Sequence, residues 1–122
     1  MGYRSEVAIK CEENAFEMFK EVCRKVNYLP DKIYKEGNEY ILYWDWTKWY
    51  EDFDWIQAII SVMDRLDKLN DSKSDKDTGY GYKFLRLGED DTDIETREND
   101  WNIELWMKRE IDIPDGLEEV II

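Results

Sequence analysis

Carboxylates crowd one short stretch of the sequence, the run from Gly88 to Asp100. In an extended chain, alternate side chains of such a run share one side at a spacing of about 6.6–6.8 Å. Two base-pair steps along DNA cover a similar distance, at about 3.4 Å each. A row of carboxylates could therefore imitate phosphates at a basic groove, and the plainer alternative is a solvated loop. The expected contact residues are Glu89, Asp90, Asp91, Asp93, Glu95 and Glu98.

The spacing of this run does not support a calcium loop. If Asp91 stands first in an EF-hand loop, Thr96 occupies the position that needs glycine. Asn102 then occupies the position that needs a bidentate glutamate. A looser cation site is the remaining alternative, and we expect no metal and no cofactor.

Aromatic residues form a second cluster, and Trp44, Trp46, Trp49 and Tyr50 lie within seven residues of one another. Exposed Trp and Tyr side chains anchor protein partners or stack on bases. The same residues at the end of a strand could instead pack under a helix. We expect core packing for part of the cluster, and partner contacts from Trp49 and Tyr50.

Basic residues near the aromatic residues offer an alternative ligand site. Trp46, Trp49, Lys83 and Arg86 together could hold a nucleotide between aromatic rings and cationic groups. The plainer interpretation of Lys83 and Arg86 is cross-strand pairing with the surrounding carboxylates.

The residue types argue against an enzyme. Histidine is absent, which removes the Ser-His-Asp and Cys-His mechanisms and histidine-containing zinc sites. The two cysteines, Cys11 and Cys23, fall on apolar stripes, so we expect them to fill the core. No spacing singles out a catalytic pair of carboxylates.

The charge is uneven along the chain. The whole protein carries 17 basic and 30 acidic residues, a net charge of −13. Residues 1–50 contribute a charge of −1, whereas residues 51–122 contribute −12. Such a surface repels nucleic acid and anionic membranes and attracts basic partners.

Length and hydropathy predict one cytoplasmic domain over residues 1–122. No apolar run approaches the roughly 20 residues of a membrane span, and residues 1–7 lack the apolar segment of a signal peptide. An aromatic content of 15% is typical of a packed fold rather than of an acidic disordered chain.

Hydrophobic periodicity predicts an α+β fold in the order β-α-β-β-α-β-β. This order matches a ferredoxin-like, split β-α-β arrangement, in which two helices cover one face of an antiparallel sheet. The other face would be exposed or covered by a partner, so a homodimer is plausible. The acidic run would connect the last two strands. The predicted helices span 12–27 and 52–69, and the predicted strands span 3–11, 32–36, 39–46, 79–87 and 101–108.

Two stretches resemble small uncharacterised proteins of phages and prophages of Gram-positive bacteria. These are Met1-Gly-Tyr-Arg-Ser-Glu-Val7 and Gly81-Tyr-Lys-Phe-Leu-Arg-Leu-Gly-Glu-Asp-Asp91. The resemblance transfers no catalytic motif. It implies a host-defence inhibitor, such as an anti-CRISPR protein, acting in the host cytoplasm.

The sequence thus leads to two functional hypotheses. The first is a non-catalytic inhibitor whose acidic, nucleic-acid-mimicking surface binds a basic, nucleic-acid-binding surface of a defence protein, without contacting nucleic acid or membrane itself. The alternative is a sequestering protein for a nucleotide immune signal.

Overall fold

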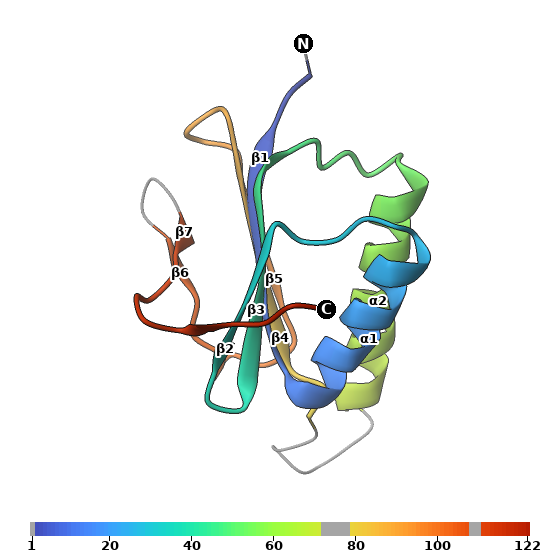
Figure 1. Cartoon of the computed structure of the whole chain (residues 1–122). Coiled ribbons are helices and arrows are strands. Elements are labelled where there is room, and N and C mark those ends of the chain that lie inside the picture. Colours follow the sequence, from blue (N-terminus) through green and yellow to red (C-terminus); the bar gives the residue numbers. More distant parts are fainter. Residues whose placement is uncertain (1, 72–78, 108–110) are drawn as a thin grey trace.

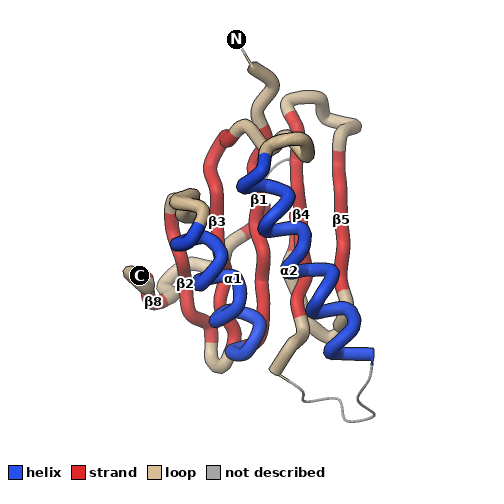
Figure 2. Tube along the Cα trace, turned by 90° about the vertical axis from the view of Figure 1, so that its right-hand side faces the viewer, coloured by secondary structure: helices blue, strands red, loops and turns tan. Residues whose placement is uncertain are grey.

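A computed structural model describes residues 2–71, 79–107 and 111–122 of the chain. Two helices pack on one face of a six-stranded antiparallel sheet, whose strand order is β5-β4-β1-β3-β2-β8 (Figures 1 and 2). Neither helix is long and apolar enough to cross a bilayer within these residues. The elements are β1 (Ser5–Glu12), α1 (Glu13–Lys25), β2 (Lys32–Glu36), β3 (Glu39–Thr47), α2 (Asp54–Asp71), β4 (Tyr82–Gly88), β5 (Ile94–Glu98), β6 (Trp106–Met107), β7 (Ile111–Asp112) and β8 (Glu118–Glu119).

The two helices form where hydrophobic periodicity predicts them. Helix α1 ends where Asn27 adopts a positive φ of 56°, a conformation that asparagine tolerates at helix ends. Four apolar residues at helical spacing on α2 are buried and form the stripe that faces the sheet. These are Ile56, Ile59, Met63 and Leu66.

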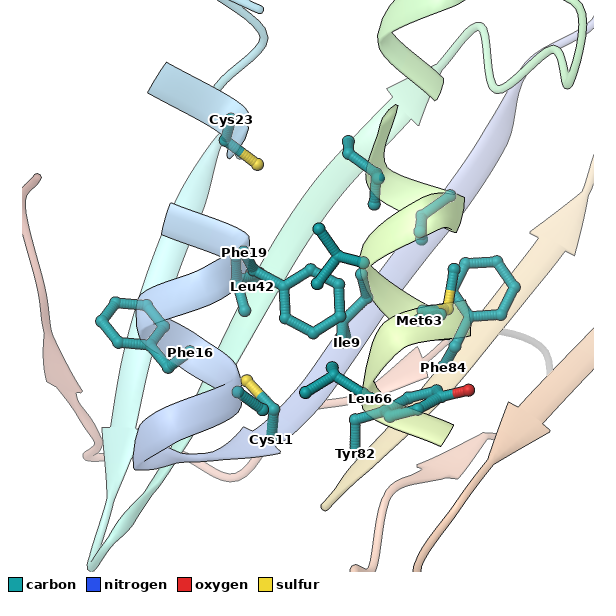
Figure 3. Close-up of a cluster of buried hydrophobic side chains, with 14 of the residues drawn as sticks. Ile9, Cys11, Phe16, Phe19, Cys23, Leu42, Met63, Leu66, Tyr82 and Phe84 are labelled. Carbon is teal, nitrogen blue, oxygen red and sulfur yellow. The ribbon is translucent and has the colours of Figure 1, made fainter. Parts of the chain in front are cut away.

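The main core lies between the helices and the sheet. In each strand every second side chain points toward the helices, where it packs against the apolar side chains of α1 and α2. Figure 3 shows side chains of α1 and α2 facing those of the strands. The core includes Ile9, Phe19, Leu42, Met63 and Tyr82.

The second face of the sheet is covered by the chain's own C-terminal segment, and this differs from the predicted open face. The β6–β7 hairpin lies on the side opposite the helices (Figure 1). Leu105 and Ile111 pack there against Ala8, Ile41 and Leu85. The open face was the reason to expect a second copy of the chain, and that reason no longer applies.

The strand predicted over 101–108 forms only at Trp106–Met107, as β6, which pairs with β7 in a separate two-stranded sheet and not with β4. Its Lys108 lies outside the described residues. Strand β5 lies inside the acidic run and occupies the place beside β4. Trp101 is 81% exposed, whereas Ile103 and Leu105 are buried. Leu105 therefore contributes its apolar side chain to the second face without extending the sheet.

Loss of the Leu105 side chain should destabilise the fold, because it would leave a cavity under the second face. We expect Leu105→Ala to lower the free energy of unfolding by about 2–4 kcal/mol. Trp101→Ala should change it by less than about 0.5 kcal/mol. Urea denaturation followed by circular dichroism measures both values, and a larger loss in Trp101→Ala would contradict this packing.

The two cysteines fill the core, as predicted. Both Cys11 and Cys23 are free and buried, and both belong to the main core (Figure 3). Burial raises the pKa of the Cys23 thiol to about 12 and raises the pKa of Cys11 well above its ordinary value. Little reactive thiolate is therefore present near neutral pH.

We expect neither thiol to react with Ellman's reagent while the protein is folded. Both should react after unfolding in urea, which exposes the thiols and returns their pKa values to the ordinary range. Absorbance at the thiolate band gives the number of reacting groups. Rapid reaction of either thiol without denaturant would show that the core opens there.

Candidate functional site

The acidic run folds as a tight turn followed by a strand, so the extended row of carboxylates expected from the sequence does not form. Residues 89–93 reverse the chain between β4 and β5. The backbone N–H of Gly88 donates to the carbonyl of Asp93 at 2.8 Å, and that of Asp93 donates to Asp90 at 2.9 Å. A side chain at Gly88 would collide with Tyr3 and Asp93, so this close approach requires glycine.

Arg86 binds two of the six expected contact residues within the chain. Its guanidinium donates to both carboxylate oxygens of Asp93, at 2.8 and 3.0 Å. It also donates to Glu95 at 2.9 Å and to the hydroxyl of Ser5 at 3.1 Å. Asp93 and Glu95 therefore stabilise the hairpin, and the single charge of Arg86 offsets about half of their combined charge before any partner arrives.

Tyr3 completes the support of the turn. Its hydroxyl donates to Asp93 at 2.7 Å and accepts the backbone N–H of Asp90 at 3.1 Å. Hydrogen bonds from Arg86 and Tyr3 lower the pKa of Asp93 from 3.8 to about 2. Asp90 in turn accepts the N–H and the hydroxyl of Thr92, which lowers its own pKa. Residues at both ends of the turn are thus fixed by side-chain hydrogen bonds.

Three of the expected contact residues are presented to solvent at the turn. Glu89, Asp90 and Asp91 are exposed, and one oxygen of Glu89 accepts the backbone N–H of Arg4 at 3.2 Å. Glu98 is also exposed, but it lies at the far end of β5, opposite Lys83. The structure therefore gathers Glu89, Asp90 and Asp91 and separates them from Glu98.

Trp49 cannot contact a partner in this fold, contrary to the expectation from the sequence. It is only 6% exposed, and its ring packs at 5.3 Å from Trp44 and 5.8 Å from Phe84. Its neighbour Tyr50 is half-buried and packs on Phe53 at 4.9 Å. The connection from β3 to α2 turns Trp49 inward, where it fills the core beneath α2.

The four residues of the alternative nucleotide site do not come together. Lys83 lies with its ammonium 5.8 Å from the ring of Trp106, on the second face of the sheet. Arg86 is occupied by carboxylates and Trp49 is buried. Only Trp46 stays exposed, at 48%, and it lines a pocket that the other three do not reach.

The sequence alone did not predict that pocket, because its residues come from four separate segments of the chain. The segment before β1, the connection from α1 to β2, the end of β3 and the start of α2 all contribute to it. Its volume is about 510 Å³. Trp46 and Trp55 were visible as aromatic residues, but nothing in their spacing joins them to Arg4 or Tyr28.

The described part of the chain contains no group of three or more carboxylate or thiol side chains that could hold a metal ion.

Comparison with known proteins finds no matching family model, no matching curated protein and no matching solved structure. The resemblance to phage proteins therefore rests on the two sequence stretches alone.

The Asp93 interactions should make stability depend on acidic pH. Because the pKa of Asp93 is about 2 in the folded protein, its stabilising contribution is complete above the ordinary pKa near 4 and is lost as the pH falls through about 2. We expect Asp93→Asn to be less stable than the natural protein at about pH 6, by roughly 1 kcal/mol. The difference should shrink at about pH 3 and below.

Urea denaturation at several pH values, followed by tryptophan fluorescence, measures this effect. Asp91→Asn serves as the control, because it removes the same charge from an exposed side chain of the same turn. It should change stability by less than about 0.5 kcal/mol throughout. A deficit in Asp93→Asn that stays constant with pH would contradict the assigned role.

Proposed function

We propose that the protein is a non-catalytic binding protein that presents its acidic β4–β5 turn to a basic, nucleic-acid-binding surface of another protein. The observation that supports this most directly is the support beneath the turn. Arg86 and Tyr3 hold Asp93, while Glu89 and Asp91 stay exposed. A turn that is ordered before binding loses less conformational entropy when it docks.

The overall charge supports the same proposal. Ion pairs within the described residues join four cations to seven carboxylates, and none involves Glu89, Asp90 or Asp91. These three charges therefore add fully to the field of a chain with a net charge of −13. Such a field accelerates association with a basic surface and opposes contact with nucleic acid.

We further propose a ferredoxin-like, split β-α-β relation among the first six elements. In support, β1 lies between β3 and β4, and β2 lies outside β3. All of these neighbours are antiparallel, and both helices lie on one face (Figure 2). Strand β5 then extends the sheet and carries the acidic turn at its edge.

The biological setting is proposed from the resemblance to phage proteins. A phage protein of this kind would act in the host cytoplasm as an inhibitor of a defence system, in the manner of an anti-CRISPR protein. Its partner would be a nuclease effector whose basic groove normally holds nucleic acid. Occupation of that groove by the acidic turn would exclude the target.

Competition with nucleic acid tests the proposal. A labelled DNA duplex is bound to each of a panel of purified, RNA-loaded nuclease effectors from Gram-positive bacteria, and its release is followed by fluorescence anisotropy. The protein should displace the duplex from at least one effector at about 0.1 M salt. Displacement should weaken steeply toward about 0.5 M salt, because added ions screen the charges.

Charge removal at the turn should weaken displacement more than the same removal elsewhere. We expect Glu89→Gln with Asp91→Asn to raise the half-maximal concentration by about tenfold or more. Glu13→Gln with Glu21→Gln is the matched control, because both glutamates are exposed on α1 and the net charge changes equally. This control should shift the half-maximal concentration less than about threefold.

Two results would contradict the proposal. Equal weakening by both double variants would show that net charge alone matters and that the turn is not the contact. Failure to displace the duplex from any effector in the panel would remove the proposed partner class.

A further inference from the structure

The pocket beside Trp46 has the size and the mixed lining of a small-molecule site. Its volume is about 510 Å³, within the range of about 300–1,000 Å³ that is common for ligand pockets. Aromatic rings and charged groups both line it. The lining residues include Arg4, Tyr28, Trp44, Trp46, Lys48 and Trp55.

Trp46 is held in an unusual backbone conformation. Its φ is +50°, in the left-handed region that bulky L-residues rarely adopt. The strand register explains how it arises, because Val7 pairs with Trp44 while Ser5 pairs with Thr47, so β3 contains one extra residue. Strained positions of this kind occur often at functional sites, and bulges redirect side chains.

The strained backbone displays the Trp46 ring rather than burying it. The guanidinium of Arg4 donates to the Trp46 carbonyl at 3.2 Å and fixes the bulge. The ring is 48% exposed, and it stacks on no other aromatic ring among the described residues. A flat ring surface is thus free beside the pocket.

Other rings in the pocket lining contact one another. Trp55 packs against Phe53 at 4.6 Å and against Tyr28 at 6.3 Å between ring centroids. Tyr28 in turn stacks on Trp44 at 6.1 Å. The indole N–H of Trp44 is buried and has no hydrogen-bond partner within the described residues. The lining therefore offers aromatic surface, while the Trp44 donor lies buried beneath it.

Two cations at the pocket are available to an anionic ligand. Arg4 and Lys48 both line it, and neither forms an ion pair within the described residues. Asp31 and Asp45 also line it without an ion pair; Asp31 accepts the backbone N–H of Asp45 at 2.6 Å, and Asp45 lies 3.5 Å from the Tyr43 hydroxyl. The lining therefore carries two cations and two carboxylates, and Arg4 and Lys48 are the groups that an anion would contact.

We propose that this pocket binds a free mononucleotide, or a chemically similar planar aromatic anion. The base would stack on Trp46, and the phosphate would lie near Arg4 and Lys48. A nucleic-acid strand carries the same chemistry, but the net charge of −13 repels a polyanion over long range. The structure thus favours the small ligand, and this site is independent of the acidic turn.

Fluorescence titration of the purified protein tests the proposal. The four ribonucleoside monophosphates are the main probes, and adenosine, inorganic phosphate, choline and a short single-stranded oligonucleotide are the comparison ligands. We expect at least one monophosphate to quench tryptophan emission with a dissociation constant below about 1 mM. Adenosine should bind more weakly than its monophosphate, and phosphate alone should not quench.

Substitutions distinguish the contribution of the Trp46 ring to binding from the effect of its strained backbone on stability. Trp46→Gly removes the ring and suits a positive φ, so the urea midpoint should stay equal or rise while nucleotide affinity falls at least tenfold. Trp55→Leu gives a second variant at the aromatic lining, with a similar direction. Lys48→Gln should weaken the monophosphate about threefold to tenfold and leave adenosine unchanged.

Trp101→Ala is the matched control, because it removes an exposed indole outside the pocket and should leave affinity within about twofold. The proposal is overturned if no monophosphate binds below about 1 mM, if Trp46→Gly binds as well as the natural protein, or if choline or the oligonucleotide binds more tightly than every monophosphate. Trp46→Gly should also displace the DNA duplex normally, so failure here is distinguishable from failure of the acidic-turn proposal.

Discussion

Strand β1 is buried on both of its faces, and the rest of the fold follows from this constraint. Every residue from Ser5 to Cys11 is buried, and β1 pairs with β3 on one side and β4 on the other. Helices α1 and α2 cover one face, so another segment must cover the second. There the buried Glu6 accepts hydrogen bonds from Tyr43 and from the backbone of Ile111, which satisfies its carboxylate.

The central position of β1 also places the N-terminal residues beside both candidate surfaces. Ser5 pairs with Gly88 on one side and with Thr47 on the other. Tyr3 therefore reaches Asp93 in the acidic turn. Arg4 contacts Glu89 through its backbone and Trp46 through its side chain. In Figure 1 the N-terminus, this turn and the connection from β3 to α2 lie at one end of the molecule.

Charges of opposite sign have different roles at this end. The turn exposes acids whose charges are unpaired, and their long-range field favours basic partners and opposes polyanions. The pocket holds two cations, Arg4 and Lys48, beside two carboxylates, Asp31 and Asp45. In the proposed binding mode a small anion lies close to Arg4 and Lys48, within the distance of about 10 Å over which exposed charges interact at moderate salt.

Patterns among adjacent residues were sufficient to predict the elements that depend mainly on residues nearby in the sequence. The hydrophobic period of residues 12–27 and 52–69 predicts the two helices. Gly37 and Asn38 separate the predicted strands 32–36 and 39–46, and Gly37 adopts a φ of 61° in the turn between β2 and β3. The two cysteines were also placed correctly in the core. Each of these predictions depends on a hydrophobic period or on a backbone preference of a few adjacent residues.

The remaining features of the fold depend on which of several distant segments occupies each place beside the sheet. The alternation of residues 101–107 is as typical of a strand as that of β4, yet the place beside β4 is taken by β5, whose charges suit an edge exposed to solvent. Arg86 and Asp93 lie close together only because β4 pairs with β5. The pocket forms only where four separate segments of the chain converge. By itself the sequence determined the helices, the hairpin and the acidic charge. Tertiary structure alone decided which carboxylates are neutralised, which tryptophans are exposed and where a ligand could enter, because these depend on contacts between residues far apart in the chain.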